Sequence, residues 1–168
     1  MTRILICTNM VQGSIRTYCP IFCKQGKIIT RNIINSYPEF DYVWHINDQH
    51  TKSDDEFEYM PIHCLAGSYD AHPIEYSFRR NNFTVFNKKR ASGVDKLPVK
   101  ASVEHFIKEG AIFTVGGFLT NHDVYCTAWA IKNIGGTVKV RLDLTGCLSQ
   151  ESKEEAVSRL LASHIEVI

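Results

Sequence analysis

The chain has 168 residues, with 19 lysines and arginines against 18 aspartates and glutamates and a formal net charge of +1. This length favours one domain, residues 1–168, that buries a sizeable core. The longest basic cluster, Lys88-Lys89-Arg90, is too short for a nucleic-acid or anionic-membrane surface. No apolar run approaches the roughly 20 residues of a membrane span, and the start lacks a signal-peptide pattern. We therefore expect a cytoplasmic protein with neither nucleic acid nor membrane as a partner.

The six cysteines do not have the spacing of a zinc finger or of a disulfide framework. No Cys-x2-Cys pair occurs, and Cys19 and Cys23 stand alone as Cys-x3-Cys. A free cysteine in a cytosolic protein behaves as a small core hydrophobe. Buried thiols are the prediction.

The first half of the chain predicts two strands and one helix. Ile4–Thr8 is a short apolar run that ends in polar Asn9, as expected of a buried parallel strand. A helical pattern over 20–36 is interrupted at Gly26, so we predict a helix over its second half, after a loop at Gly13–Cys19. Tyr42–Ile46 reads as a second strand. An irregular segment rich in Asp, His, Tyr and Pro then runs to about residue 82, and segments of this kind are usually functional.

The second half alternates strands with helices. The predicted elements are strand Thr84–Asn87, helix Ser102–Glu109, strand Ile112–Val115, helix His122–Ile134, strand Val138–Leu144, helix Glu151–Ser163 and strand Ile165–Ile168. This alternation predicts an α/β fold, a three-layer αβα sandwich with a mostly parallel sheet. Ligands bind such sheets outside the carboxyl ends of the strands.

Residues 111–128 form the expected centre of the site. An apolar strand runs into Gly116-Gly117, a short turn follows, and a helix begins near His122. Free backbone N–H groups gather at such a helix start and favour negative charge. Asp123 lies in that first turn, either as a catalytic group or as an ordinary helix-start carboxylate.

A second pattern, Asp48-x-His50 followed by His63, has the composition of a divalent-metal site. One carboxylate and two imidazoles leave coordination positions open for water or substrate. Asp48 and His50 can point the same way on an extended segment, and His63 can return from the loop. The alternative is that both histidines are ordinary polar loop residues.

A third set of groups follows the strand ends: Asn9, Lys88 (or its neighbour Lys89) and Asp123. A lysine beside a carboxylate is often only an ion pair, whereas catalysis needs a nucleophile and a base within hydrogen-bond reach. Asn9 cannot accept a proton, so Asp123 is the candidate base.

Five segments in chain order carry a resemblance to a known family. They are Ile4–Met10, similar to a strand ending in Asp-Met; Asp48-Gln49-His50, similar to Asp-Trp-His; Pro61–Ser68, similar to Pro-x-His-Cys-x-x-Gly-Thr; Phe86–Ser92, similar to a strand bearing a catalytic lysine; and Gly117–Val124, similar to Gly-x-Ala-Thr-Asp-x-Cys-Val. Together they resemble the isochorismatase-like hydrolases, and within them the nicotinamidases.

The resemblance implies a six-stranded parallel sheet with helices on both sides, usually in a homo-oligomer. It implies a divalent metal on Asp48, His50 and His63, with zinc the first choice and iron or manganese the alternatives. This metal would hold the ring nitrogen of a nicotinamide-like ligand. It also implies a cis peptide before Leu119 and an oxyanion hole formed by the backbone N–H groups of Leu119 and Asp123.

The departures from the family pattern fall on the chemistry. Asp123 stands at the position of the nucleophilic cysteine and Asn9 at that of the general-base aspartate, which leaves Lys88 alone of the triad. Two functions follow as hypotheses. In one, Asp123 and a metal-oriented water hydrolyse a nicotinamide-like or related small substrate. In the other, the protein is a pseudoenzyme that binds a nicotinamide-like ligand or a protein partner.

Overall fold

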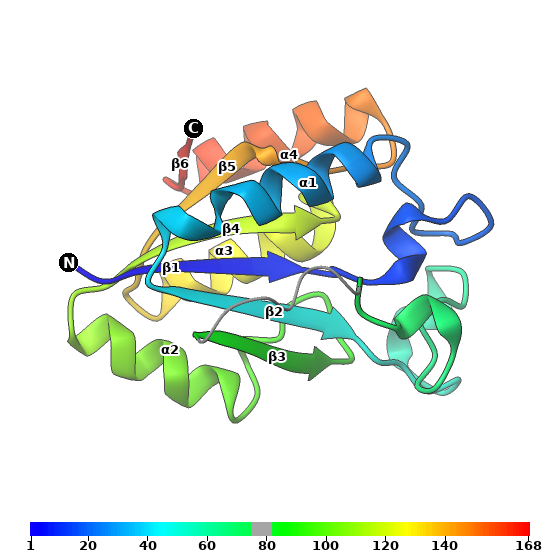
Figure 1. The fold of residues 1–168 in the computed structure, drawn as a ribbon, viewed down its shortest axis with the longest axis horizontal. Coiled ribbons are helices and arrows are strands. Elements are labelled where there is room, and N and C mark those ends of the chain that lie inside the picture. The colour runs from blue at the N-terminus through cyan, green and yellow to red at the C-terminus, as the bar shows by residue number, and fades with distance from the viewer. Residues whose placement is uncertain (75–81) are drawn as a thin grey trace.

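The computed structural model of the chain describes residues 1–74 and 82–168, and their centre is a six-stranded parallel sheet (Figure 1). The strand order is β3-β2-β1-β4-β5-β6. The strands are β1 (Arg3–Thr8), β2 (Tyr42–Asp48), β3 (Phe83–Lys88), β4 (Ile112–Phe118), β5 (Thr137–Gly146) and β6 (Glu166–Val167). The predicted α/β fold with a six-stranded parallel sheet is confirmed.

Helices cover both faces of this sheet. They are α1 (Gly26–Ser36), α2 (Val99–Lys108), α3 (Tyr125–Asn133) and α4 (Gln150–Ala162). Alternate residues of β1 enter different cores: Leu5 packs with Ile29 and Ile33 of α1, whereas Ile4 packs with Val103 of α2 and Ile131 of α3. Burial on both sides explains why β1 is apolar without alternation.

Several predicted boundaries were wrong. The helix predicted at His122–Ile134 begins as a π-helical turn, Thr120–Val124, in which the Val124 N–H bonds Leu119 O over five residues at 3.0 Å, before α3 starts. The spacing of apolar residues in the sequence does not show whether a helical turn contains one extra residue. Helix α2 starts three residues before the predicted Ser102, and the predicted loop at Gly13–Cys19 begins in a short 3-10 turn.

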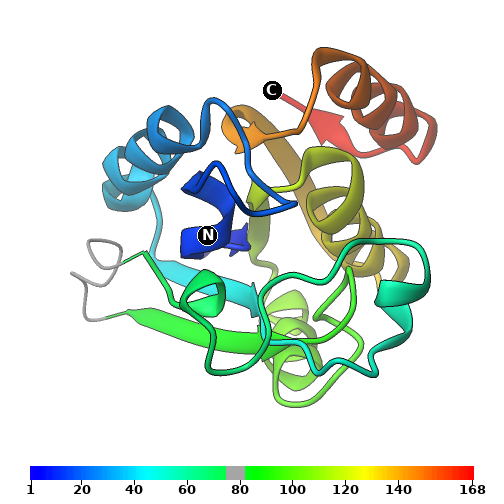
Figure 2. The ribbon, with the colours of Figure 1, turned by 90° about the vertical axis from the view of Figure 1, so that its right-hand side faces the viewer.

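The predicted irregular segment after β2 is confirmed over its described part, which holds the short 3-10 turns Asp55–Glu58 and Tyr69–Ala71 and single β-bridges at His50–Leu65 and Val11–Pro73. Residues 75–81 of that segment lie outside the described residues. Figure 2 faces the carboxyl ends of the strands, and the loops that follow β1 and β2 lie over this end.

The end of β4 requires glycine. Gly117 has a φ of +100°, and a Cβ placed there would lie 2.2 Å from Thr8 O on the neighbouring strand. Only glycine fits so close an approach in this conformation. The next peptide, Phe118–Leu119, is cis, as the family resemblance implies, and the Thr8 hydroxyl donates to Phe118 O at 2.7 Å.

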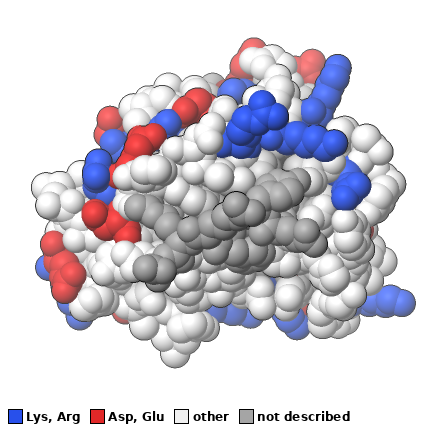
Figure 3. Space-filling view, viewed as in Figure 1, with Lys and Arg blue, Asp and Glu red and all other residues white. Residues whose placement is uncertain are grey.

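The surface has no dominant charge on the face that Figure 3 shows, where lysines and arginines as well as aspartates and glutamates lie among uncharged residues. Among the described residues, no helix has both the length and the apolarity needed to cross a membrane.

Candidate metal centre

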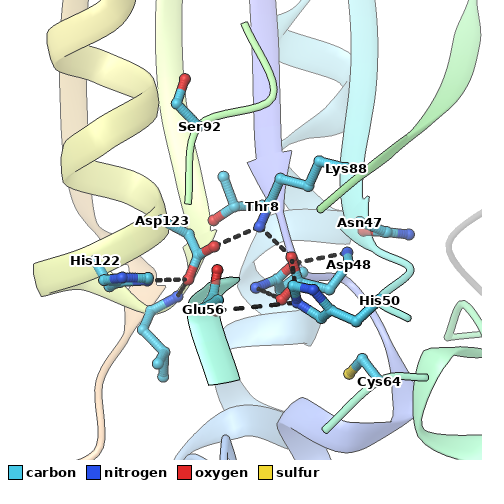
Figure 4. A network of polar contacts seen from close by, with 12 residues as sticks. Thr8, Asn47, Asp48, His50, Glu56, Cys64, Lys88, Ser92, His122 and Asp123 are labelled. Atoms are coloured by element: carbon cyan, nitrogen blue, oxygen red, sulfur yellow. Dashed lines mark hydrogen bonds and ion pairs between the residues drawn. The ribbon is translucent and has the colours of Figure 1, made fainter. Parts of the chain in front are cut away.

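Asp48 and Lys88 meet because each is the last residue of its strand. Their Cα atoms are register partners in the parallel pairing of β2 with β3. Both side chains are buried, and the Lys88 ammonium donates to Asp48 Oδ1. Lys89, the other candidate from the sequence, is exposed. The register of two edge-side strands therefore places a carboxylate against an ammonium below the protein surface (Figure 4).

Asn9 holds the opposite side of the Asp48 carboxylate. It follows β1 with a φ of 51°, a conformation that asparagine adopts more readily than most residues. Its Nδ2 donates to Asp48 Oδ2 at 2.7 Å, and its Oδ1 accepts the Asp48 N–H at 3.0 Å. Asn9 therefore positions Asp48. Its side-chain amide donates a hydrogen bond to the Asp48 carboxylate, whereas an aspartate at this position would repel that carboxylate.

The predicted metal ligands come together. His50 Nε2 and His63 Nε2 each lie 3.6 Å from an Asp48 carboxylate oxygen. One ligand atom from each of the three residues falls within 4.8 Å of the others, and all three side chains are buried. Zinc bonds of about 2.0–2.1 Å at a tetrahedral angle place neighbouring ligand atoms about 3.3 Å apart. Small side-chain shifts are enough to close this trio on an ion.

Each imidazole is oriented from its far side. His50 Nδ1 lies 3.1 Å from Asp54 Oδ2, and His63 Nδ1 lies 2.8 Å from Pro61 O. Because both partners are acceptors, each Nδ1 carries a hydrogen, which leaves Nε2 as the atom of each ring that can bind a metal ion. Metal-binding histidines in proteins are usually oriented in this way.

Glu56 is a further acidic group at this centre. Its Oε1 lies 3.9 Å from His50 Nε2 and 3.7 Å from His63 Nε2. Among the described residues, Glu56 Oε2 and His50 Nε2 are buried without a hydrogen-bond partner. Unpartnered buried polar atoms are costly unless an ion or water satisfies them. The donor set therefore fits a divalent cation.

Charge balance supports the same conclusion. When ionised, the buried carboxylates Asp48, Glu56 and Asp123 face one buried ammonium, Lys88, and neutral imidazoles add nothing. The described side chains of this cluster then carry an excess of two negative charges, which one divalent cation neutralises. Burial, followed by the charges of Asp48 and Asp123, raises the pKa of Glu56 above its usual value, as expected of a carboxylate in an acidic cluster.

The shifts in pKa at the trio reflect the same close contacts. Burial alone would raise the pKa of Asp48, but the Lys88 charge and hydrogen bonds from both imidazoles hold it well below its usual range. Burial lowers the pKa of His50 and His63, yet the hydrogen bond and charge of Asp48 outweigh it, so both pKa values are raised. Asp48 is thus an ionised ligand, and a bound cation would displace protons from the imidazoles.

Asp123 lies across Lys88 from Asp48, with every oxygen engaged. Lys88 Nζ is 2.5 Å from Asp123 Oδ1, while the Leu119 N–H donates to Oδ2 at 3.3 Å and His122 Nδ1 lies 3.4 Å from the same atom. Burial lowers the pKa of Lys88, but the charges of Asp123 and Asp48 outweigh it and raise the value. The Leu119 N–H, predicted as an oxyanion donor, is therefore occupied by the Asp123 carboxylate.

A groove of about 650 Å³ opens beside the centre. The turn around Asp54 and Glu56, the loop from Lys89 to Lys96 and the face of α3 at Trp129 form its walls. Asp54 and Glu56, which contact the ligand histidines, belong to its lining, whereas Asp48, Lys88 and Asp123 do not.

Sequence reasoning missed Glu56, Asp54 and His122. Asp54 and Glu56 belong to the run Ser-Asp-Asp-Glu, which reads as a solvated loop. The one available signal was the spacing of Asp54, four residues after His50. His122 has a raised pKa, because of its hydrogen bond to Asp123.

The molecule as a whole resembles solved structures closely in shape and weakly in sequence. An isochorismatase-like hydrolase from Alkaliphilus metalliredigens superposes with a TM-score of 0.86 at 20% identity, over 99% of this chain and 94% of that one. The fold is that of the isochorismatase-like hydrolases. The pyrazinamidase of Pyrococcus horikoshii, solved in complex with zinc, gives a TM-score of 0.83 at 16% identity, over 100% and 99% of the two chains.

A third similar structure is that of PnC1 from L. infantum, solved in complex with nicotinate. It gives a TM-score of 0.83 at 18% identity, over 99% of this chain and 92% of that one. No family model and no curated protein matches the sequence. The likeness therefore lies in the fold, and the function must be argued from the site itself.

Proposed function

We propose that this protein binds a divalent metal ion on Asp48, His50 and His63, and a small nicotinamide-like ligand on that ion, without acyl transfer. The observation that carries the proposal is the state of the two carboxylates that share Lys88. Asp48 is held by Lys88 and Asn9 and also faces the Nε2 atoms of two imidazoles, of which His50 Nε2 has no hydrogen-bond partner among the described residues. Asp123 instead lies against Lys88, the Leu119 N–H and His122.

A divalent ion held there would supply a Lewis acid for the ring nitrogen or carboxylate of a small ligand. The protein's part is to orient it: Asp54 and Pro61 O fix the imidazoles, and Asn9 and Lys88 fix the carboxylate. Neighbours solved with zinc and with nicotinate support this choice of ion and ligand. Zinc is the first choice, with iron and manganese as alternatives.

The groups around Asp123 argue against catalysis by the route of the family. Asp123 has no thiol to form a thioester, and direct carboxylate attack on an amide leads to a mixed anhydride of high energy. The N–H group of Leu119 cannot stabilise an oxyanion while it bonds Asp123. Asn9 cannot take a proton, and its amide is committed to Asp48.

A second candidate is hydrolysis of a small substrate by water, with Asp123 as the base. It is favoured by the position of Asp123, buried beside the metal centre, and by His122, which contacts it and has 27% of its side chain exposed. For Asp123 to accept a proton, it would have to give up part of its bonding with Lys88 and Leu119. That cost places this function second.

The decisive experiment compares the parent with variants for metal content, nicotinamide binding and ammonia release. We expect the purified parent to retain metal and to bind nicotinamide in calorimetry only when metal is present. We also expect it to release no ammonia. The double variant Asn9→Asp with Asp123→Cys, which restores the family pattern, is the positive control for ammonia release.

Two results would overturn the proposal. Ammonia release by the parent that Asp123→Asn abolishes would establish the water-based hydrolase instead. A parent that retains no zinc, iron or manganese after loading would remove the metal centre. Self-association into a homo-oligomer stays a prediction from the resemblance, to be measured by light scattering.

A further inference from the structure

Two cysteines from separate loops meet next to the metal centre. A Cβ placed on Gly13 would lie 2.9 Å from Cys19 Sγ and 3.2 Å from Cys64 Sγ, so both sulfurs face the same point. Cys19 and Cys64 are buried, 5% and 1% exposed, in one apolar cluster with Leu119. The absence of a side chain at Gly13 leaves the room in which the two thiols approach each other.

The backbone of Cys64 is linked to both histidines of the metal centre. It follows His63 directly in the chain, and its carbonyl accepts the His50 N–H at 3.0 Å. Its φ of 44° is in the left-handed region, which a non-glycine residue adopts only where its surroundings require it. In Figure 4 Cys64 lies near His50, on the side of the network away from Asp123. A displacement of Cys64 is therefore passed directly to His63 and His50.

We propose that Cys19 and Cys64 are a redox-sensitive dithiol that a hydroperoxide converts to a disulfide, and that this modification loosens the metal centre. The inference about the dithiol stands independently of the proposed function. Only its effect on metal binding rests on the metal site.

The chemistry balances with a hydroperoxide as the oxidant. The Cys19 thiol gives up its proton, its thiolate attacks one oxygen of hydrogen peroxide, and the O–O bond breaks to leave a sulfenic acid and hydroxide. The hydroxide takes up the proton from Cys19 and becomes one water. The Cys64 sulfur then attacks the Cys19 sulfur, the S–O bond breaks, and the hydroxyl leaves as a second water with the Cys64 proton. The two sulfurs lose two electrons in total, which the peroxide accepts.

Cys19 is suited to the first step. The Cys64 thiol lies 3.6 Å from Asp70 O, to which it can donate. The proximity of the same thiol lowers the pKa of Cys19, against the opposing effect of burial. The other cysteines near this end are less suited, since burial raises the pKa of Cys23 and of Cys126. A thiolate with a second thiol in contact is the usual arrangement of an oxidisable pair.

Closing the bond must move Cys64. A disulfide brings its sulfurs to about 2.05 Å and its Cβ atoms to about 3.8 Å, closer than non-bonded contact allows. Because His50 and His63 are tied to Cys64 through the backbone, a movement of Cys64 changes the positions of both imidazoles relative to Asp48. Disturbing groups that orient metal ligands typically lowers metal affinity about 10–100-fold.

The test treats the zinc-loaded protein with a small excess of hydrogen peroxide and maps cysteine-containing peptides by mass spectrometry under non-reducing conditions. We expect a cross-link between the Cys19 and Cys64 peptides, reversed by dithiothreitol. Transfer of zinc to a colorimetric chelator should be about 10–100-fold faster after oxidation. Cys19→Ser should prevent both changes, and Cys126→Ser should prevent neither.

The outcomes separate cleanly. A first product on Cys126, a link between Cys23 and Cys147, or no link at all would overturn the dithiol. A Cys19–Cys64 link with unchanged zinc transfer would overturn the coupling to the metal centre. The mapping needs no metal, so it decides the dithiol even if the metal site fails. Cys19→Ser alters no neighbour of the ligands, so the test does not depend on Cys64→Ser folding.

Discussion

A buried carboxylate and at least one imidazole lie on each side of Lys88. The two sides differ in whether the polar atoms of these groups all have hydrogen-bond partners. On one side, Asp48 faces two imidazole nitrogens, of which His50 Nε2 has no hydrogen-bond partner among the described residues. On the other, Asp123 accepts from Lys88 and from the Leu119 N–H, with His122 at its edge. Buried polar atoms without hydrogen-bond partners can bind an ion or a ligand. Buried polar atoms that already have their partners are typical of a structural ion pair. Buried charge alone would not have told the two sides apart.

The largest effect is expected when a metal ligand is removed from the Asp48 side of Lys88. We expect His50→Ala and His63→Ala each to abolish metal retention, because an open site with three protein ligands does not tolerate the loss of one. Metal content after gel filtration measures this. The matched control is His105→Ala, whose side chain is 63% exposed on α2 and pairs with Glu109 away from the metal centre. Retention of metal by both site variants would contradict the prediction.

Removing the shared ammonium tests the saturated side. Lys88→Met leaves Asp48 and Asp123 buried without their cation, which typically costs about 3–5 kcal/mol of unfolding free energy. Urea denaturation of the metal-free protein measures the loss. Lys89→Met, at the exposed neighbouring position, should change stability by less than about 0.5 kcal/mol. Equal effects of the two substitutions would show that Lys88 is not the buried counter-ion.

A smaller effect is expected when Asp54, the hydrogen-bond partner of the ligand His50, is replaced. Asp54→Asn weakens the acceptor that orients His50 through Nδ1 and should lower metal affinity about 10–100-fold. Competition with a chelator of known affinity measures the change. Asp55→Asn is the control, since the neighbouring Asp55 side chain is 86% exposed and lies 4.0 Å from Arg90. An unchanged affinity in Asp54→Asn would mean that Pro61 O and the ligands alone set the geometry.

The smallest effect should come from an ion pair of similar composition at the surface. Arg141 lies 2.7 Å from both Glu39 and Asp143, whose side chains are 53% and 54% exposed. Arg141→Met should cost about 0.2–1 kcal/mol. Hydrogen bonding to Arg141 lowers the pKa of Asp143, against the effect of burial. This contribution is thus complete above about pH 4 and declines as the pH falls further. A loss as large as that in Lys88→Met would contradict the role given to burial.

The fold and much of the site were predictable from local patterns. Apolar runs such as Ile4–Thr8 located the strands, and Asp48, His50 and His63 stood out because imidazoles and a carboxylate at strand and loop ends are a metal-ligand set. Glu56 was not predictable, since only the folded turn aims it at both histidines. The π-helical start at Thr120–Val124 was also missed, because hydrophobic periodicity reports a face and not a turn of five residues.

By itself, the sequence determined the parallel α/β sandwich and the identity of the groups at its carboxyl edge, including Asp123 and Asn9. These depend on residue type and short-range order, which a linear pattern records. The tertiary structure decided which groups are satisfied. Strand register sets Asp48 against Lys88, and the turn at Leu119 returns an N–H to Asp123. These hydrogen bonds depend on distances between residues far apart in the chain. The difference between the Asp48 side of Lys88, which can bind a metal, and the Asp123 side, which forms an ion pair, therefore arises only on folding.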